Sequence, residues 1–443
     1  MINLLSNNMK IKDTLLHKFC SIFFVQIILF TIFSNSLHSQ NKSDTISLNL
    51  QQVEKRFIDS NFLLLASHYN VDAQKALIEQ AKLWQNPTLN TDFQLGADGK
   101  FFNYGKYDDG KGGHFLGQYY LQVQQLIMTA GKRGKLINMA STNAKMSELQ
   151  MQDVLRNLRY QLHQDYYNLA QQLNLLDLYN QQTVELDVLL KGMQAQLSVG
   201  NIAQKDLIRI QALSIALQQD ITDLKKGIAD TESDLKTLLQ ITKQSTFIQP
   251  AKDSISVKIP DQGLDKLVND ALTSNPNYLL QQSATTYQQQ SLAYQKALRV
   301  PDLTLGPNFD RNSNYAPNYV GMGISLPLPI LNKNQGNIKS AQYGVKQQQA
   351  ITQNAETELI NNVGNAYAKL VLTVQQNSTM QQGFYNQYQT VYTNMLGSYK
   401  RREINLLEFL DFYNDYNASQ QRLIQQNLNL HLAAEELSYQ IGK

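Results

Sequence analysis

The stretch Pro87-Thr88-Leu89-Asn90-Thr91-Asp92-Phe93-Gln94-Leu95 marks a change from a helical pattern to strict alternation. Odd-numbered positions from Leu89 to Leu95 are apolar or β-branched, and even-numbered positions from Thr88 to Gln94 are polar. A period of two residues with one apolar face is typical of a β-strand that buries one side. This stretch therefore predicts a strand that begins where a helix stops at Pro87.

The same alternation recurs in three further segments, so each half of the chain is expected to supply one hairpin, at 88–126 and at 302–328. Strands of about 9 to 11 residues with one apolar face are the signature of outer-membrane barrels, although one hairpin alone is equally typical of a half-buried soluble sheet. Four strands cannot close a barrel. Two copies would give eight strands with a filled interior, whereas three copies give twelve strands and a lumen, which favours a trimer.

Two spacings indicate that the chain is a tandem duplication. Ser60-Asn61-Phe62 and Asn86-Pro87-Thr88-Leu89 recur 214 residues later as Ser274-Asn275-Pro276 and Val300-Pro301-Asp302-Leu303. Further on the spacing is 202 residues, as between Gly200-Asn201-Ile202 and Arg402-Glu403-Ile404. A period this long does not fit a solenoid, so we expect two copies of one module, 40–261 and 262–443.

Long helices are predicted on both sides of these motifs. The span 136–197 contains no proline and carries leucines at three- and four-residue spacing, which predicts one helix of roughly 95 Å. Shorter helices at 61–85 and 203–241 would add to nearly the same length. The second half repeats the pattern with 338–399, 277–299 and 405–441; tips are expected at 198–203 and 400–405, and a linker at 242–261. Such helices fit the wall of a tube; an extended coiled-coil rod would leave the hairpins unexplained.

The N-terminal segment 1–39 reads as a secretory signal peptide, with lysines before an apolar run from Phe19 to Phe33. The run is shorter than the roughly 20 residues of a transmembrane helix, so a retained anchor is the weaker alternative. Cys20, the single cysteine, lies within it. The mature chain is therefore expected to lack disulfides and cysteine metal sites.

Composition argues against several functional classes. The net charge of +3 is too small to indicate nucleic-acid binding, and the mean hydropathy of −0.37 is that of a polar protein. No nucleotide loop, catalytic triad or metal-ligand spacing stands out, so we predict no enzyme, no cofactor and no resident metal site. The scattered histidines, His163 among them, are expected to be ordinary surface or seam residues.

Four motifs together resemble the TolC family of outer-membrane efflux proteins, also called outer membrane factors, over essentially all of the mature length. They are Gly131-Lys132-Arg133-Gly134, the segment from Leu326 to Ile338 that begins Leu-Pro-Leu-Pro-Ile-Leu-Asn, and the tips around Gly200 and around Ile404 to Asp411. The Gly-Lys-Arg-Gly, Pro-Leu-Pro-Ile-Leu-Asn and Leu-Leu-Glu-Phe-Leu-Asp stretches most resemble the CzcC-like branch, which is associated with divalent heavy-metal efflux.

This resemblance implies a mainly α fold with a β-barrel portion: a trimeric twelve-stranded transmembrane barrel continued by a periplasmic α-helical barrel. It implies a passive conduit from periplasm to exterior, located in contact with outer-membrane lipid. The implied partners are two further copies, a periplasmic adaptor (membrane fusion) protein and an inner-membrane pump of the RND type. The expected cargo is divalent heavy-metal cations or small toxic compounds. A type I protein-secretion duct and a structural or adhesive periplasmic coiled coil are the alternatives.

The resemblance also suggests a periplasmic gate of acidic residues, at Glu408 and Asp411 with Asp206 as the counterpart in the first repeat. Asp415 extends the same helix face, since positions i, i+3 and i+7 lie together. The alternative is a solvated acidic face paired with Lys400, Arg401 or Arg402. Adaptor contacts are expected at the tip turns: Val199, Gly200, Asn201, Ile202, Arg402 and Ile404.

One residue departs from the family pattern. Arg402 stands where a turn glycine is expected, and a left-handed backbone there would cost about 1 kcal/mol or more. At the other end of the helices, an interfacial role is expected for Trp84, Tyr119 and Tyr319. For Trp84, simple packing at the helix-to-barrel junction is the alternative.

Overall fold

The computed structural model describes residues 44–97, 100–101, 106–107, 114–115, 119–251, 257–312, 316–379 and 382–443. The predicted signal segment 1–39 lies outside these residues. The chain divides into two compact units, Met1–Ser47 with Ile241–Gln249, and Leu48–Gln240 with Pro250–Lys443. Strands β1 (Asp44–Leu48) and β8 (Thr246–Pro250), which lie mainly in the first unit, form a two-stranded sheet. The elements described below belong to the second unit.

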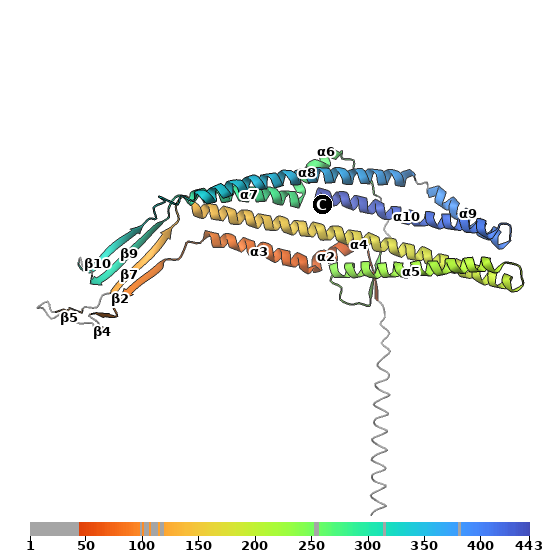
Figure 1. Cartoon of the computed structure of the whole chain (residues 1–443), viewed down its shortest axis with the longest axis horizontal. Coiled ribbons are helices and arrows are strands. Elements are labelled where there is room, and N and C mark those ends of the chain that lie inside the picture. The colour runs from red at the N-terminus through yellow and green to blue at the C-terminus, as the bar shows by residue number, and fades with distance from the viewer. Residues whose placement is uncertain are drawn as a thin grey trace, which may run out of the picture. The chain divides into compact units, whose positions relative to one another are not determined.

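The main sheet contains the two predicted hairpins (Figure 1). Strands β2 (Thr88–Phe93) and β7 (Tyr119–Ile127) form the first hairpin, and β9 (Leu303–Asn312) and β10 (Pro317–Ser325) form the second. The order is β10-β9-β7-β2, and every neighbouring pair is antiparallel. The pairing of β7 with β9 joins the halves, which leaves β2 and β10 at the edges.

The described residues between β2 and β7 form four short strands. Strand β3 (Gly96–Ala97) pairs with β4 (Lys100–Phe101), and β5 (Lys106–Tyr107) pairs with β6 (His114–Phe115). They belong to the connection between β2 and β7. This connection is longer than its counterpart in the second half, between β9 and β10.

The register of the main sheet gathers apolar side chains on one face. Leu121 lies opposite Phe309, and Phe309 lies opposite Val320 on the next strand. Residues on this face are largely exposed, with Val320 at 74% and Ile324 at 69%. The other face is polar: a row crosses all four strands at Asn90, Gln122, Asn308 and Gly321. The two-residue alternation predicted from the sequence therefore produces one continuous apolar surface on the sheet. No described residue of the chain packs over this surface.

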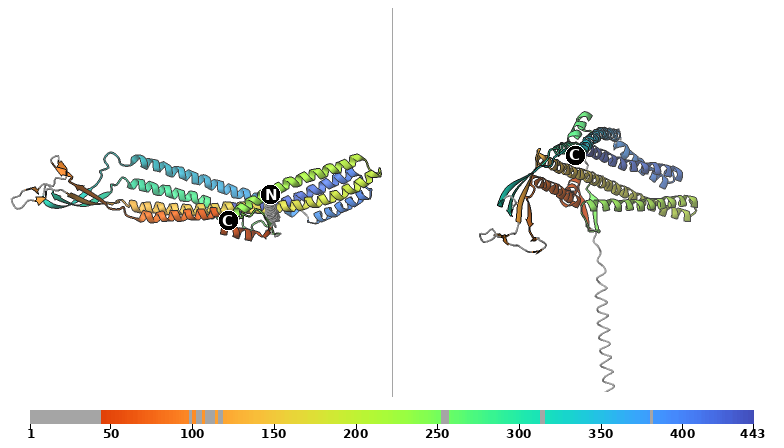
Figure 2. Two further views of the ribbon diagram at one scale, coloured as in Figure 1. Left: turned by 90° about the horizontal axis from the view of Figure 1, so that it is seen from below. Right: turned by 60° about the vertical axis from the view of Figure 1, so that its left-hand side comes forward.

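The helices nearest the sheet pack in a single row. Helix α4 (Lys132–Ser198) contacts α3 (Phe62–Lys82) on one side and α7 (Pro276–Ala297) on the other, and α7 contacts α8 (Gln335–Thr379). Figures 1 and 2 show α3, α4, α7 and α8 running side by side from the sheet. The outer members of the row are α3 and α8. Each belongs to the same half as the edge strand on its side, β2 or β10.

Further from the sheet the row continues with other helices. Helix α4 contacts α5 (Gln204–Leu238) and α10 (Leu406–Ile441), and α10 contacts α9 (Gln382–Lys400). Two short helices, α2 (Leu50–Ser60) and α6 (Leu264–Ser274), pack on α4 and on α8. Helix α4 is continuous over 67 residues, whereas the expected helix 338–399 is described as α8 and α9, with residues 380–381 outside the described range.

Contacts in the structure repeat with the two spacings seen in the sequence. The side-chain amide of Asn61 caps α3 and donates to the carbonyl of Leu238 at 3.0 Å. Asn275 caps α7 and donates to the carbonyl of Gln440 at 3.0 Å. The donors are 214 residues apart and the acceptors 202. The same bond thus ties the start of a short helix to the end of another in both halves, which confirms the predicted duplication.

Candidate functional site

The two helical tips have the same turn geometry. In the first tip, Gly200 has φ 72° and its amide donates to the carbonyl of Leu197 at 2.9 Å. In the second tip, Arg402 has φ 65° and its amide donates to the carbonyl of Tyr399 at 3.0 Å. The following amide closes the turn in each case. Arg402 therefore adopts the left-handed conformation expected of the missing glycine.

Side-chain bonds hold the strained second turn. A guanidinium nitrogen of Arg402 donates to Oε1 of Gln196 at the end of α4, and Asn201 of the first tip donates to the same oxygen at 3.0 Å. Arg401 pairs with Glu403, Nε to Oε1, at 2.7 Å. Bonds to Arg401 and then Ser398 lower the pKa of Glu403 to about 2. The two tips are therefore joined through Gln196.

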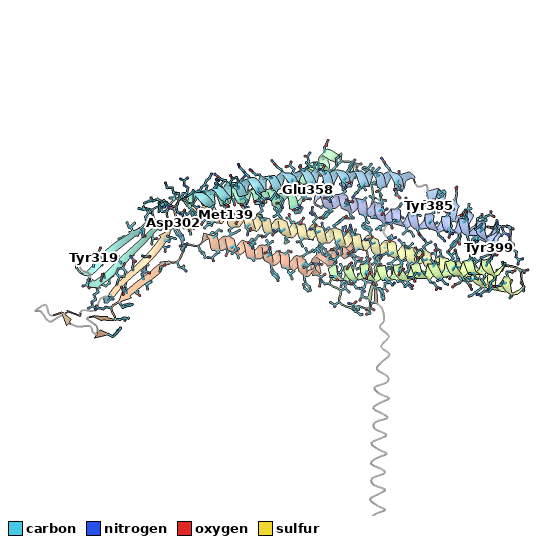
Figure 3. All side chains as sticks on the ribbon, viewed as in Figure 1. Met139, Asp302, Tyr319, Glu358, Tyr385 and Tyr399 are labelled. Carbon is cyan, nitrogen blue, oxygen red and sulfur yellow. The ribbon has the colours of Figure 1, made fainter. Side chains whose placement is uncertain are left out.

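A groove of about 540 Å³ separates the tips. Asp206, Ile202 and Arg402 line it, so the counterpart acid of the first repeat faces the gap between the tips. Burial and then the negative charge of Asp206 raise the pKa of Tyr399, which lines the same groove and lies near the helix ends in Figure 3. Val199, at 66% exposed, is accessible at the turn.

The acidic face of α10 is open to solvent. Asn405 caps the helix by accepting from the amide of Glu408 at 2.9 Å, which places Glu408 in the first turn, where the helix dipole favours negative charge. Glu408, Asp411 and Asp415 are all exposed. Among the described residues no ion pair includes any of them, and Arg401 pairs elsewhere. The alternative arrangement, in which these acids pair with Lys400, Arg401 or Arg402, is therefore absent among the described residues, and no bond there joins these acids to Asp206.

Buried aromatic rings support this face from behind. Phe409, Tyr413 and Tyr416 lie on the opposite side of α10, and Tyr392 of α9 stacks on Tyr416 with ring centroids 4.3 Å apart. The Tyr392 hydroxyl donates to Glu185 of α4. Burial and then the bond to Glu185 raise the pKa of Tyr392, so it remains a donor at physiological pH. The side of α10 opposite the acidic face therefore packs on aromatic rings that connect it to α9 and α4.

At the sheet end, Lys132 of the Gly-Lys-Arg-Gly motif is buried at the junction. Its ammonium lies 2.7 Å from Oδ1 of Asp302 and donates to the carbonyl of Val300 at 2.6 Å. The amide of Thr129 donates to the same Asp302 oxygen at 2.8 Å. Figure 3 shows Asp302 where the sheet meets the helices. The motif is therefore a connector that fastens the end of β7 to the start of β9.

The three residues with a predicted interfacial role fall in different places. Trp84 is 59% exposed, and the guanidinium of Arg133 lies 4.2 Å from its ring centre. Tyr119 is on the apolar face, opposite Phe93. Tyr319 belongs to the polar face, because it pairs with Asp310 and its ring covers Gly321 two residues along. Tyr319 therefore does not share the apolar face with Tyr119.

One histidine has a role that sequence spacing did not reveal. His163 is 7% exposed and lies between two carboxylates: Nδ1 is 2.6 Å from Oε2 of Glu435, and Nε2 is 2.8 Å from Oε1 of Glu54. Burial lowers the pKa of His163, but the bonds to Glu435 and Glu54 outweigh it and raise the pKa to about 9. The imidazolium thus ties α2 and α10 to the middle of α4.

The described residues contain no group of three or more histidine, cysteine or carboxylate side chains arranged to hold a metal ion. Among them no helix is both long enough and apolar enough to cross a membrane.

Comparison with known proteins identifies the family to which this architecture belongs. The family model for "Outer membrane efflux protein" matches residues 55–239 and 267–443, one segment in each half. The chain is 22% identical over 291 residues to the cobalt-zinc-cadmium resistance protein CzcC of Cupriavidus metallidurans. That match covers 64% of this chain and 63% of the relative, so it spans less than two thirds of the relative's length.

Solved structures share the fold at low sequence identity. The Campylobacter jejuni CmeC outer membrane channel superposes with a TM-score of 0.74 at 14% identity, covering 89% of this chain and 85% of that one. CusC, a protein whose transmembrane channel formation has been described, gives 0.72 at 16% identity, with coverage of 89% and 92%. The predicted fold class, family and location are confirmed. The chain belongs to the outer membrane efflux protein family, and its location is the outer membrane, with its helical portion in the periplasm.

Proposed function

We propose that three copies of the chain assemble into one conduit that exports divalent metal cations from the periplasm. The observation that carries the proposal is the open sheet of four strands, with one apolar face and edge strands β2 and β10. A sheet edge with unpaired backbone groups is unstable in a membrane unless another strand covers it. Pairing of β10 with β2 of the next copy removes every edge, and three copies give the twelve strands that leave a lumen.

The helical row supports the same assembly. Its outer members, α3 and α8, lie on the same sides as β2 and β10, so one rotation brings both pairs of edges together. Exposed apolar side chains mark both helices: Phe62 is 66% exposed on α3, and Leu372 is 66% exposed on α8. In this proposal the repeats 40–261 and 262–443 each contribute one hairpin and one helical tip.

The acidic face of α10 supports cations as cargo. Threefold symmetry would convert Glu408, Asp411 and Asp415 into rings of carboxylates, and rings of one sign concentrate the opposite ion. These side chains are exposed and unpaired within the described residues, so their charge acts on solution ions. The name of the relative, a cobalt-zinc-cadmium resistance protein, supports the same class of cargo.

The energy and the partners come from outside this chain in our proposal. We expect an inner-membrane pump of the RND type and a periplasmic adaptor that contacts the exposed tip turns at Val199 to Ile202 and at Arg402 to Ile404. The two tips are joined through Gln196, so an adaptor that docks on one would also move the other.

A growth experiment tests the cargo. A strain that lacks the chain should become sensitive to Zn²⁺, Co²⁺ or Cd²⁺, and the wild-type chain should restore tolerance. A variant with Glu408→Ala and Asp411→Ala should restore less tolerance to the cations than the wild-type chain does. Its effect on tolerance to a neutral drug should be smaller. Unchanged metal tolerance together with a loss of drug or protein export would contradict the proposed cargo.

A further inference from the structure

A second cavity lies at the end of the helices next to the sheet, opposite the end that carries the tips (Figure 1). It occupies about 1060 Å³ between the end of α7 and the start of α8. We call it the basic groove, and its lining includes Leu292, Arg299, Ile330, Leu331, Lys333, Ile338, Lys339 and Lys346. The segment 326–334, which connects β10 to α8, closes one side.

The lining of the basic groove is cationic. Arg299, Lys333, Lys339 and Lys346 are exposed, and no aspartate or glutamate is among the lining residues. None of the four forms an ion pair with another described residue; Lys346 only lies 5.9 Å from the ring centre of Tyr343. Four like charges around one concavity raise the local concentration of anions. A ligand that complements this lining would therefore carry negative charge.

The groove is also amphipathic. Leu331 is 91% exposed and Ile330 is 70% exposed, and both line it, while Leu328 beside them is 70% exposed. Exposed leucines next to unpaired lysines fit a ligand with an anionic head and an apolar body. A small inorganic anion would leave the apolar wall without a function.

The position of the groove identifies the source of such a ligand. Strand β10 ends at Ser325 and α8 begins at Gln335, so the groove lies directly where the membrane portion gives way to the periplasmic helices. In the proposed barrel, this is the level of the lipid headgroups in the periplasmic leaflet, where basic residues attract anionic lipids.

We propose that the basic groove binds the headgroup of an anionic phospholipid from the periplasmic leaflet of the outer membrane, with Leu328, Ile330 and Leu331 against its acyl chains. This inference rests on the outer-membrane location and is independent of the cargo.

Native mass spectrometry of the full chain tests this proposal, with dioleoylphosphatidylglycerol as the anionic probe and dioleoylphosphatidylcholine as the neutral one. The test variant combines Lys333→Gln, Lys339→Gln and Lys346→Gln. The matched control removes the same charge with Lys191→Gln, Lys205→Gln and Lys225→Gln, three exposed lysines of α4 and α5. Circular dichroism confirms folding of both.

The expected result is a preference of the wild-type chain and the control for the anionic lipid, and a loss of roughly tenfold or more in that preference for the test variant, since each juxtamembrane cation contributes severalfold. Binding of phosphatidylcholine should be unchanged. Equal retention of phosphatidylglycerol by the test and control variants would overturn the proposal, as would a structure of the assembled protein in which side chains of a neighbouring copy fill the groove. Conductance in planar bilayers reports separately on the conduit.

Discussion

Arg402 occupies the left-handed position of the second tip that Gly200 occupies in the first, with φ 65° against 72°. An arginine in this conformation costs about 1 kcal/mol relative to glycine. The bond from Arg402 to Gln196 offsets that cost and also links the tips. The second tip thus lacks glycine, the most favourable residue for this turn, and instead has an arginine that bonds to the first tip through Gln196.

Two substitutions at this position separate strain from contact. Arg402→Ala removes the bond but retains a side chain at positive φ, whereas Arg402→Gly removes both. The glycine variant should therefore be more stable at this turn than the alanine variant by about 1 kcal/mol. Hydrogen exchange of the Arg402 and Glu403 amides, which close the turn, measures the difference. Equal protection in the two variants would show that the backbone is not strained here.

Neutralising the acidic face should change ion selectivity. Glu408→Gln with Asp411→Asn removes two rings of charge in the proposed trimer, so cation-over-anion selectivity in planar bilayers should fall. A control pair, Asp261→Asn with Asp265→Asn, removes the same charge near the start of α6 and should leave selectivity unchanged. If both pairs behave alike, the acidic face does not line the ion path.

The cluster around His163 should make stability depend on pH in the alkaline range. The folded pKa of about 9 exceeds the ordinary value of 6.5, so the stabilisation is complete below pH 6.5 and disappears as the pH rises through 9. His163→Gln should cost roughly 3 kcal/mol at pH 6 and little above pH 10. Thermal unfolding followed by circular dichroism at several pH values tests this.

His68 provides the matched control for that measurement. It is an exposed histidine of α3 whose Nε2 lies 3.6 Å from Asp72. His68→Gln should therefore have almost no effect at any pH. A constant difference between wild type and His163→Gln from pH 6 to pH 10 would contradict the ionic account of His163.

The junction between sheet and helices should depend on the pairing of Lys132 with Asp302. Lys132→Met leaves a largely buried carboxylate without its cation and should cost roughly 3 kcal/mol. Adding Asp302→Asn should recover part of this loss, because an amide oxygen still accepts from the Thr129 amide. Trp84 is the single tryptophan and sits against the neighbouring Arg133, so its fluorescence reports unfolding at this site. A double variant as unstable as Lys132→Met would argue against the ion pair.

Local patterns allowed much of this architecture to be predicted. Alternation along each strand separated Leu89 and Val320 from their polar neighbours, and pairing then placed these residues on one surface. The repeat spacing also indicated which position of the second tip needs a left-handed backbone. Both features depend on residues close in sequence or on a fixed displacement.

Contacts without such a pattern could not be predicted. The partners of His163 lie 109 and 272 residues away on other helices, so its spacing to other histidines carried no information. The pairing of β7 with β9 likewise depends on how the two halves pack. The groove between α7 and α8 required the connection from Leu326 to Asn334 to be placed in space.

Cross-linking of the edge strands tests the central claim most directly. Within one chain β2 and β10 are separated by two strands, which puts them roughly 14 Å apart, too far for a disulfide. A chain with Cys20→Ser and Thr91→Cys, combined in turn with Val320→Cys, Met322→Cys or Ile324→Cys, can therefore form disulfides only between copies. We predict that at least one pair yields covalently joined species ending at three copies. Monomers alone from every pair, or a ladder that extends beyond three, would contradict a closed trimeric conduit.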